Sequence, residues 1–210
     1  MNKGKFEQYN LPVQEKHFDN AAQVVAGLYN LKRTGWVDRG VANPETVGEH
    51  TDAMRILAGE IVKKLPSETQ KKIDTKKLER MIQVHDWPEH HDGDKVVARE
   101  DKREEEKLTA KKRISEEKAM RKICARIGPE GKINLDLWLE FEEGKTLEGN
   151  LAKQIDKLQA MIKAWEYEQK GEPVKAMDFI NHDRHKITEP VLIDIMKDIE
   201  KQATINNKTT

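Results

Sequence analysis

The sequence has only one cysteine, Cys124. A single thiol cannot form an intrachain disulfide, and it cannot build a zinc site from several thiolates. Aromatic residues make up only 5% of the chain, and runs of β-branched residues are scarce. Helix-favouring Lys, Glu, Ala, Leu and Ile dominate instead, and no segment alternates with the period of a strand. Together these absences predict an all-α fold.

The chain also lacks an excess of charge of either sign, because 38 basic residues balance 38 acidic ones. A general nucleic-acid binder usually carries a basic surplus, so a nucleic acid polymer is not an expected partner. No apolar stretch approaches the length of about 18 residues that a membrane helix needs, and the first residues do not resemble a signal peptide. We therefore expect no membrane partner and a cytoplasmic location.

No internal repeat and no long low-complexity segment divides the 210 residues. A chain of this length is typical of one domain around one hydrophobic core. We expect a single domain over residues 1–210, with a core from about 18 to 200 and flexible ends at 1–16 and 203–210.

Apolar residues recur with helical spacing, which predicts a bundle of about six helices. The expected helices are 17–31, 45–65, 75–87, 100–127, 147–170 and one from residue 190, with a shorter helix near 135–141. The expected irregular segments are 32–44, 90–94 and 128–132. The long helix 100–127 is heavily charged and has only a thin apolar stripe, which includes Ile114. We interpret most of its charges as a solvated face, and we assign the helix no function.

A histidine and an aspartate end the helix 75–87. His85 continues the apolar stripe of Leu78, Met81 and Ile82, so it should point inward, and Asp86 follows directly. A buried carboxylate beside a buried imidazole is costly unless something pairs with both groups. A metal ion would pair with both. The alternative is a core histidine that is hydrogen-bonded to a carboxylate at the helix end.

Two further polar residues favour the metal. His50 lies on the inward stripe of the helix 45–65, and Asp156 lies at the edge of the inward stripe of 147–170, between two alanines that leave room for another group. Inward polar groups from several helices are how metal sites in helical bundles are built. Two imidazoles and two carboxylates suit one divalent ion such as Mn²⁺, Co²⁺, Fe²⁺ or Zn²⁺. The predicted metal ligands are His50, His85, Asp86 and Asp156.

Four segments extend this pattern. They are LKRTGW (31–36), NPETVGEHTDAMRILA (43–58), VHDWPEHHDGD (84–94) and DKLQAMIKAWEYE (156–168). In their order and spacing they resemble the HD-domain phosphohydrolase superfamily, and within it the 5'-deoxynucleotidase branch. The resemblance implies an HD-domain helical bundle that binds one divalent metal and assembles as a homodimer. It also implies a nucleotide substrate, namely a nucleoside 5'-monophosphate, with a preference for deoxyribonucleotides.

The resemblance implies catalytic roles for two acids beside the metal. Glu89, about one helical turn beyond Asp86, would orient the attacking water or protonate the leaving 5'-oxygen. Asp94, which follows Gly93, would bind a sugar hydroxyl or act as the second carboxylate. The alternatives are that Glu89 is an exposed acid at a helix end and that Asp94 only forms a turn.

Two residues of the first segment are expected to bind the substrate. Trp36 matches the family position whose indole packs against the sugar and disfavours a 2'-hydroxyl, although a structural tryptophan is the alternative. In the bacterial pattern an arginine directly precedes this tryptophan, whereas this chain has Gly35. Arg33 is therefore the expected phosphate contact, with Arg39 or Lys32 as alternatives.

Other histidines and other functions remain open. We expect His90 and His91 to be solvated or to support the site indirectly, and His182 and His185 to lie in a loop. One alternative function is that of an HD phosphohydrolase acting on a nucleoside triphosphate, an alarmone or a cyclic dinucleotide. Another is a metal-binding HD module without catalysis.

Overall fold

The structure is a computed structural model that describes residues 21–97 and 101–206. Within these ranges all helices and strands that can be assigned are helices. Apart from them, an isolated antiparallel β-bridge joins Lys32 to Thr46. The expected all-α fold is confirmed. The described residues form eleven α-helices rather than about six. The expected flexible end at 1–16 and the first residues of the helix 17–31 lie outside the described ranges.

The helices divide into long and short ones. The long ones are α3 (Val47–Lys64), α5 (Thr75–Val84), α7 (Lys102–Arg126), α8 (Pro129–Glu143), α9 (Leu147–Gln169) and α11 (Pro190–Asn206). The short ones are α1 (Ala21–Leu28), α2 (Thr34–Val37), α4 (Ser67–Gln70), α6 (Glu89–Asp92) and α10 (Ala176–Asp183), followed by a 3-10 turn at Arg184–Lys186.

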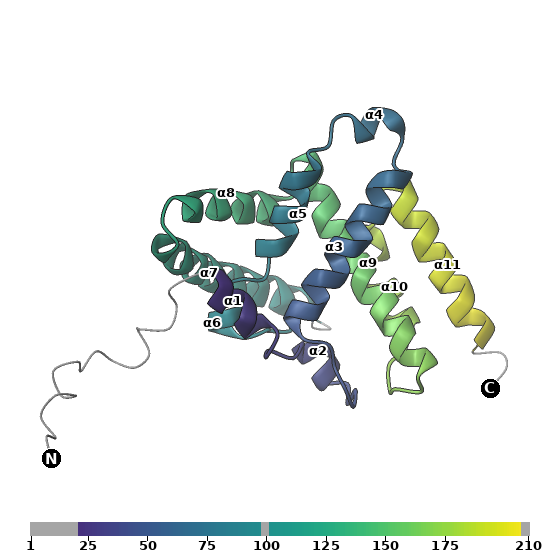
Figure 1. Cartoon of the computed structure of the whole chain (residues 1–210). Helices are drawn as coiled ribbons and strands as arrows, with labels where there is room; N and C mark the ends of the chain where they lie inside the picture. The colour runs from purple at the N-terminus through teal and green to yellow at the C-terminus, as the bar shows by residue number, and fades with distance from the viewer. Residues whose placement is uncertain (1–20, 98–100, 207–210) are drawn as a thin grey trace, which may run out of the picture.

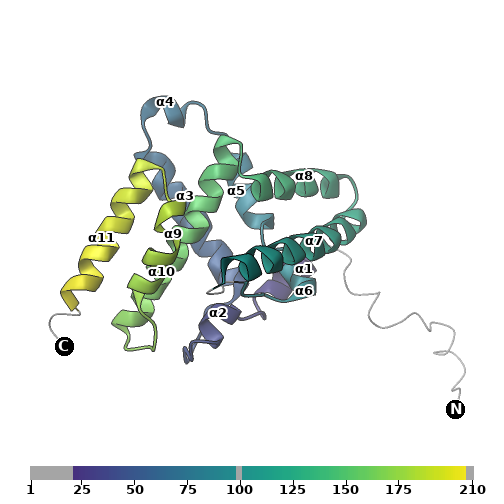
Figure 2. The ribbon, with the colours of Figure 1, turned by 180° about the vertical axis from the view of Figure 1, so that it is seen from behind.

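Three helices form the centre of the molecule, because α3, α5 and α9 each pack against the other two (Figure 1). The hairpin of α7 and α8 lies on one side of them, and α10 and α11 lie on the other (Figure 2). Met54 of α3, Ile82 of α5 and Leu158 of α9 are completely buried where the three helices meet. Any polar group at this junction has lost its contact with water and needs a partner in the protein or a ligand.

Caps set the start of each central helix. Thr46 and Glu49 form a capping box at α3, in which the backbone N–H of Glu49 donates to Thr46 Oγ1 at 3.1 Å and that of Thr46 donates to Glu49 Oε2 at 2.7 Å. Asp74 caps α5 and Thr146 caps α9 with their side chains. These caps fix the first residue of each helix and therefore the direction in which its side chains point.

Several segments that were expected to be irregular are helical. The segments 32–44 and 90–94 contain α2 and most of α6, and the expected turn at 128–132 is largely the first turn of α8. His182, expected in a loop, lies in α10. Ala203, expected in a flexible end, is completely buried in α11. Packing against the core decides these elements, because a helix of one or two turns is not stable by itself.

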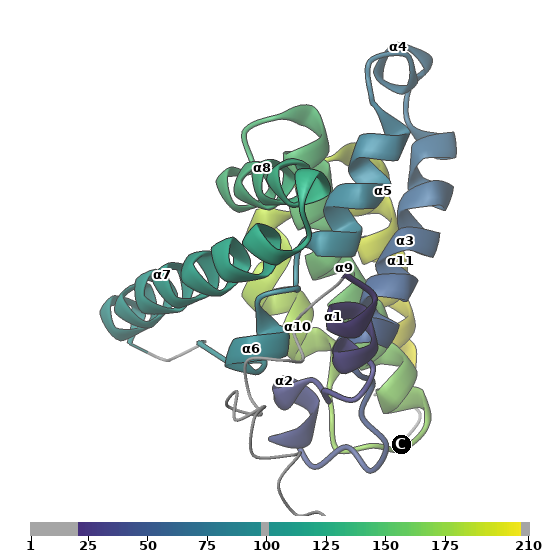
Figure 3. The same ribbon diagram turned by 60° about the vertical axis from the view of Figure 1, so that its left-hand side comes forward.

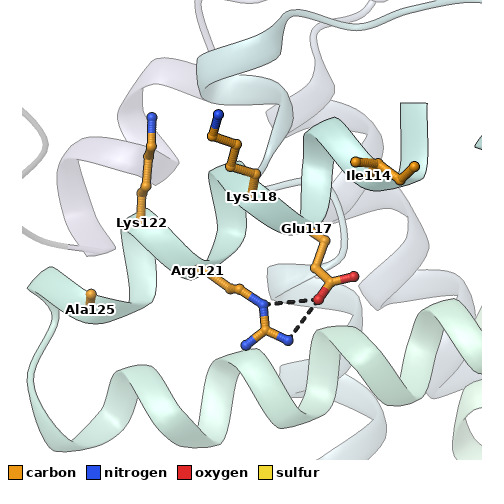
Figure 4. Close-up of a pocket in the computed structure, with 6 residues that line it drawn as sticks. All are labelled: Ile114, Glu117, Lys118, Arg121, Lys122 and Ala125. Carbon is orange, nitrogen blue, oxygen red and sulfur yellow. Dashed lines mark hydrogen bonds and ion pairs between the residues drawn. The ribbon is translucent and has the colours of Figure 1, made fainter. Parts of the chain in front are cut away.

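The stripe expected on α7 is wrong at Ile114, which is 70% exposed. The apolar contacts of α7 lie toward its C-terminal end, and its N-terminal part extends away from the body of the protein (Figure 3). A hollow on its exposed side is lined by residues of α7 itself: Ile114, Glu117, Lys118, Arg121, Lys122 and Ala125 (Figure 4). None of the helices in residues 21–97 and 101–206 is long and apolar enough to cross a membrane.

Candidate metal centre

Two buried histidines and a partly buried aspartate converge where the central helices meet. His50 comes from α3, His85 directly follows α5, and Asp156 comes from α9; their ligand atoms all lie within 4.8 Å of one another. Asp86 extends the group, because its Oδ2 lies 3.0 Å from His85 Nε2. The structure therefore brings together the four residues that the sequence pattern singled out.

The tautomer of His50 follows from its neighbours. His50 Nδ1 lies 2.6 Å from the amide oxygen of Gln159, which can only accept, so the Nδ1 carries the proton. The Gln159 amide is oriented by donation from its nitrogen to Glu45 Oε2 at 3.2 Å, and the indole of Trp36 donates to Glu45 Oε1 at 3.0 Å. His50 Nε2 is left with a free electron pair, 3.2 Å from Asp156 Oδ1. Such a hydrogen-bond chain orients a metal-binding imidazole.

His85 is held in the same way. Its Nδ1 lies 2.6 Å from the carbonyl oxygen of Ile82, which fixes the proton there, and Trp138 donates to the His85 carbonyl at 3.0 Å. The Nε2 atoms of His50 and His85 and the Oδ2 of Asp86 are buried without a hydrogen-bond partner. Buried polar atoms normally have partners. A divalent cation would satisfy all three, so the residues fit a metal.

The two carboxylates are held in their ionised form. Burial opposes ionisation of Asp86, but His85 and Arg33 outweigh it and keep the pKa of this carboxyl below its usual value. Burial likewise opposes ionisation of Asp156, and Lys157 and His50 lower its pKa well below the usual range. Metal ligands of this kind must be deprotonated, and these carboxyl groups are so at neutral pH.

A cavity of about 700 Å³ opens beside the cluster, and His85, Asp86 and Asp156 form part of its wall. Its size lies within the usual range of small-molecule sites. The remaining wall comes from helices α2, α6, α7, α8, α9 and α10, the 3-10 turn after α10, and the segment between α6 and α7. The cations that line it are Arg33, Lys95, Lys112, Arg113, Lys153, Lys157 and Lys186. Eight carboxyl groups line the same cavity, among them Asp86 and Asp156, so a ligand that reaches the cluster meets charges of both signs.

Glu89 lies in this wall and is buried, which contradicts the alternative of an exposed acid. Its Oε1 lies 3.2 Å from Lys112 Nζ, and its Oε2 has no hydrogen-bond partner. Burial and the nearby Asp86 raise the pKa of Glu89 well above its usual value, although Lys112 opposes this. The raised pKa favours the protonated form of Glu89, which is the form that a proton donor needs.

Trp36 is buried in an aromatic group and also lines the cavity. Its ring centre lies 5.2 Å from that of Tyr167 and 4.8 Å from that of Phe179. The indole N–H of Trp36 donates to Glu45, which gives Trp36 a structural role, and the same side chain also contributes to the wall of the cavity. Its contact with a sugar stays a prediction.

Arg33 and Asp94 meet at the start of α2. Arg33 Nη1 lies 3.7 Å from Asp86 Oδ2, and Arg33 lines the cavity. Asp94 Oδ2 accepts a hydrogen bond from the backbone N–H of Thr34 at 2.6 Å. Asp94 thus holds the helix that carries Arg33 and Trp36, and its side chain lines the same cavity. The roles predicted for these residues with a substrate are not decided by these contacts.

Four contributors to the site were not recognised from the sequence: Glu45, Lys112, Lys157 and Gln159. Gln159 gave a usable signal, because it lies three residues after Asp156, on the same helix face, between the buried Leu158 and Met161. Lys112 gave none, because it is one of many charges on α7.

Comparison with known proteins agrees with this geometry. The all-helical core brings two histidines and two aspartates together, and this arrangement is typical of helical proteins that bind a metal ion inside the bundle. The model of the HD domain matches residues 25–199. The chain belongs to the HD domain family, and its relatives place it in the 5'-deoxynucleotidase branch, which confirms the resemblance.

Two relatives illustrate this placement. The chain is 34% identical over 185 residues to 5'-deoxynucleotidase HDDC2 of Dictyostelium discoideum, covering 85% of this chain and 94% of that protein. It is 32% identical over 157 residues to 5'-deoxynucleotidase YGK1 of Saccharomyces cerevisiae, covering 70% and 65%.

Solved structures share the fold. A conserved hypothetical protein from Pyrococcus furiosus superimposes with a TM-score of 0.64 at 28% identity, covering 86% of this chain and 97% of that one. A predicted metal-dependent phosphohydrolase from Magnetospirillum magnetotacticum superimposes with a TM-score of 0.67 at 18% identity, covering 87% and 91%. At this identity the second likeness shows the fold alone.

Proposed function

We propose that this protein is a metal-dependent hydrolase of nucleoside 5'-monophosphates that favours deoxyribonucleotides and releases nucleoside and phosphate. One observation carries the proposal: the cluster of His50, His85 and Asp156 lies beside a cavity of nucleotide size, and His85, Asp156 and several cations, among them Arg33, form part of the wall of that cavity. Membership in a family branch whose relatives are 5'-deoxynucleotidases supports the same substrate class.

His50, His85, Asp86 and Asp156 are the proposed ligands of one divalent ion, and two imidazoles with two carboxylates suit Mn²⁺, Co²⁺, Fe²⁺ or Zn²⁺. Held by these residues, such an ion would supply Lewis-acid chemistry, which lowers the pKa of water and polarises a phosphoryl oxygen.

The chain supplies the remaining chemistry. Glu89, a buried acid with a raised pKa, acts as the general acid that donates a proton to the 5'-oxygen as the nucleoside leaves. Arg33 binds the phosphate from the wall that it shares with Asp86. Asp94 keeps α2 in place for this contact and offers its second oxygen to the sugar or to water.

We further propose that one domain carries this activity, since the match to the family extends from residue 25 to residue 199. A homodimer is proposed by analogy with the branch, and together with the cytoplasmic location it stays a prediction.

A substrate panel with metal replacement tests the function. Metal-stripped protein should release phosphate from deoxyribonucleoside 5'-monophosphates after addition of Mn²⁺ or Co²⁺ and should be inactive without metal. Nucleoside di- and triphosphates should be poorer substrates. Hydrolysis of triphosphates alone, or no hydrolysis with any of the four metals, would contradict the proposal.

The sugar preference tests Trp36. A buried 2'-hydroxyl without a partner costs roughly 1–3 kcal/mol, which corresponds to about 5- to 150-fold in kcat/KM for one deoxy/ribo pair. Trp36→Phe keeps a ring in the aromatic group but removes the larger indole surface. The ratio of kcat/KM for the deoxyribonucleotide to kcat/KM for the ribonucleotide should therefore become smaller. An unchanged ratio would leave Trp36 with its contacts to Glu45, Tyr167 and Phe179 as its whole role.

A further inference from the structure

The two oxygens of Asp156 have different neighbours. Oδ1 lies 3.2 Å from His50 Nε2, on the side of the metal cluster. Oδ2 lies 2.8 Å from Lys157 Nζ. The Lys157 side chain is 36% exposed and lines the cavity, so a ligand in the cavity can reach its ammonium group.

This ion pair joins two consecutive residues of one helix. Consecutive positions of an α-helix project about 100° apart and do not normally face each other. The flexible stem of Lys157 must therefore turn toward Asp156 to make the contact. A cation on such a stem changes partner readily when a stronger one becomes available.

A metal ion at Oδ1 and Lys157 at Oδ2 would both draw on the negative charge of one carboxylate. When Asp156 and His50 bind a divalent ion, much of the negative charge that attracts Lys157 is neutralised. The ammonium group is then available to another anion in the cavity. Arg33 stands in a similar relation to Asp86, at 3.7 Å, on a different element. Two cations thus contact the two carboxylates of the cluster.

We propose that Lys157 is a phosphate-binding residue, held by Asp156 in the absence of metal and released to the phosphate group when a divalent ion takes that carboxylate. This inference rests on the proposed function, because it takes the ligand to be the phosphate of a nucleoside monophosphate. It follows that metal and phosphate bind cooperatively, and each must strengthen the other by the same factor.

A purely structural role for Lys157 predicts the opposite effect on metal binding. If Lys157 only positions Asp156 as a ligand, Lys157→Met should weaken metal binding. If Lys157 competes with the metal, Lys157→Met should bind metal at least as tightly as the wild type, while its phosphate affinity falls. The two roles therefore differ in the direction of a measurable change.

The experiment uses the metal-stripped full chain in four forms: wild type, Lys157→Met, Lys157→Arg and Lys153→Met. Lys153 is the matched control, because it lines the same cavity but its Nζ lies 5.0 Å from the centre of the Phe141 ring. Mn²⁺ affinity is measured from the electron paramagnetic resonance signal of free Mn²⁺. Affinity for inorganic phosphate is measured by calorimetry with and without saturating Mn²⁺. Far-UV circular dichroism and Tm confirm that each variant is folded.

Lys157→Met should bind Mn²⁺ with a Kd equal to or below that of the wild type. Its Kd for phosphate in the presence of Mn²⁺ should rise roughly tenfold or more, as expected for loss of a charge-assisted hydrogen bond. The KM for deoxyadenosine monophosphate should rise in parallel, which distinguishes binding of the substrate from binding of free phosphate alone. Lys157→Arg should retain most of the phosphate affinity, and Lys153→Met should resemble the wild type.

Three results would overturn the proposal: weaker Mn²⁺ binding by Lys157→Met, equal loss of phosphate affinity in Lys153→Met, or no phosphate binding by the Mn²⁺-loaded wild type. A failure of the proposed function would look different. In that case the wild type would show the coupling between Mn²⁺ and phosphate but would not hydrolyse deoxyribonucleoside monophosphates.

Discussion

Helices α9 and α7 both contribute to the wall of the same cavity, but their sequences differ in character. Helix α9 has a broad buried stripe, and Asp156 and Gln159 are polar exceptions beside it. Helix α7 is charged along most of its length, and Lys112 and Glu116 are two charges among many. A polar residue is conspicuous on an apolar stripe, whereas a buried charge on a charged helix is not.

The two faces of α7 make the same contrast within one helix. Lys112 lies 3.2 Å from Glu89 and 3.4 Å from Glu116, in the cavity wall. Glu117 and Arg121 form an ion pair on the exposed side (Figure 4). We expected most charges of this helix to form a solvated face, and Lys112 and Glu116 are exceptions. Their side chains are only 23% and 13% exposed, because neighbouring helices rather than the local pattern shield them from water.

The largest effect should come from α9. Asp156→Ala removes a proposed metal ligand, and losing the metal removes several kcal/mol of transition-state stabilisation, so turnover should fall by roughly 10³-fold or more. Metal content is measured by elemental analysis and turnover by phosphate release. Full activity with full metal content would show that the buried carboxylate of α9 is not part of the metal site.

Substitution of Glu89 should give the next largest loss of turnover. Glu89 lies in the cavity wall with Asp86 and contacts Lys112 of α7. Glu89→Gln preserves the shape but removes the proton donor, so metal content should stay unchanged while kcat falls by roughly 10²-fold. In the wild type, kcat should decrease as the pH rises through the raised pKa of Glu89, because the acid then loses its proton. A pH profile of kcat checks both points. Glu89→Gln with the wild-type kcat would assign proton donation to another group.

Glu116 tests whether the inner face of α7 is dehydrated. Burial raises the pKa of Glu116 to about 7 despite Lys112. The folded state then binds a proton more tightly than the unfolded state, so stability falls as the pH rises from the usual carboxyl pKa to about 7. In the metal-free protein, Glu116→Gln should be more stable than the wild type by about 1–3 kcal/mol at a pH of about 8, and similar to it in acid. Urea unfolding at both pH values measures this difference.

The smallest effect should come from the exposed face. Glu117→Gln breaks the pair with Arg121, which is 55% exposed, so unfolding free energy should change by no more than about 0.5 kcal/mol, with little dependence on pH. Glu117→Gln, measured by urea unfolding at the same two pH values, is the matched control for Glu116→Gln. Equal pH dependence in both variants would mean that the two faces of α7 do not differ in hydration.

The sequence alone predicted the long helices other than α8, and it singled out the residues of the proposed metal site. The apolar stripes predicted the central helices, and the polar exceptions His50, His85 and Asp156 were found because burial of such groups demands a reason. The predicted start of the third helix at residue 75 agrees with the structure, in which the Asp74 side chain caps α5 by accepting from the backbone N–H of Lys77.

Tertiary structure alone decided what surrounds these ligands. The chain from His50 through Gln159 and Glu45 to Trp36 spans more than one hundred residues of sequence, and no local pattern records it. The contact of Lys112 with Glu89 likewise arises only when α7 packs beside α6. The physical reason is that periodicity records which residues of one helix leave water, whereas packing between helices decides which of their polar atoms meet.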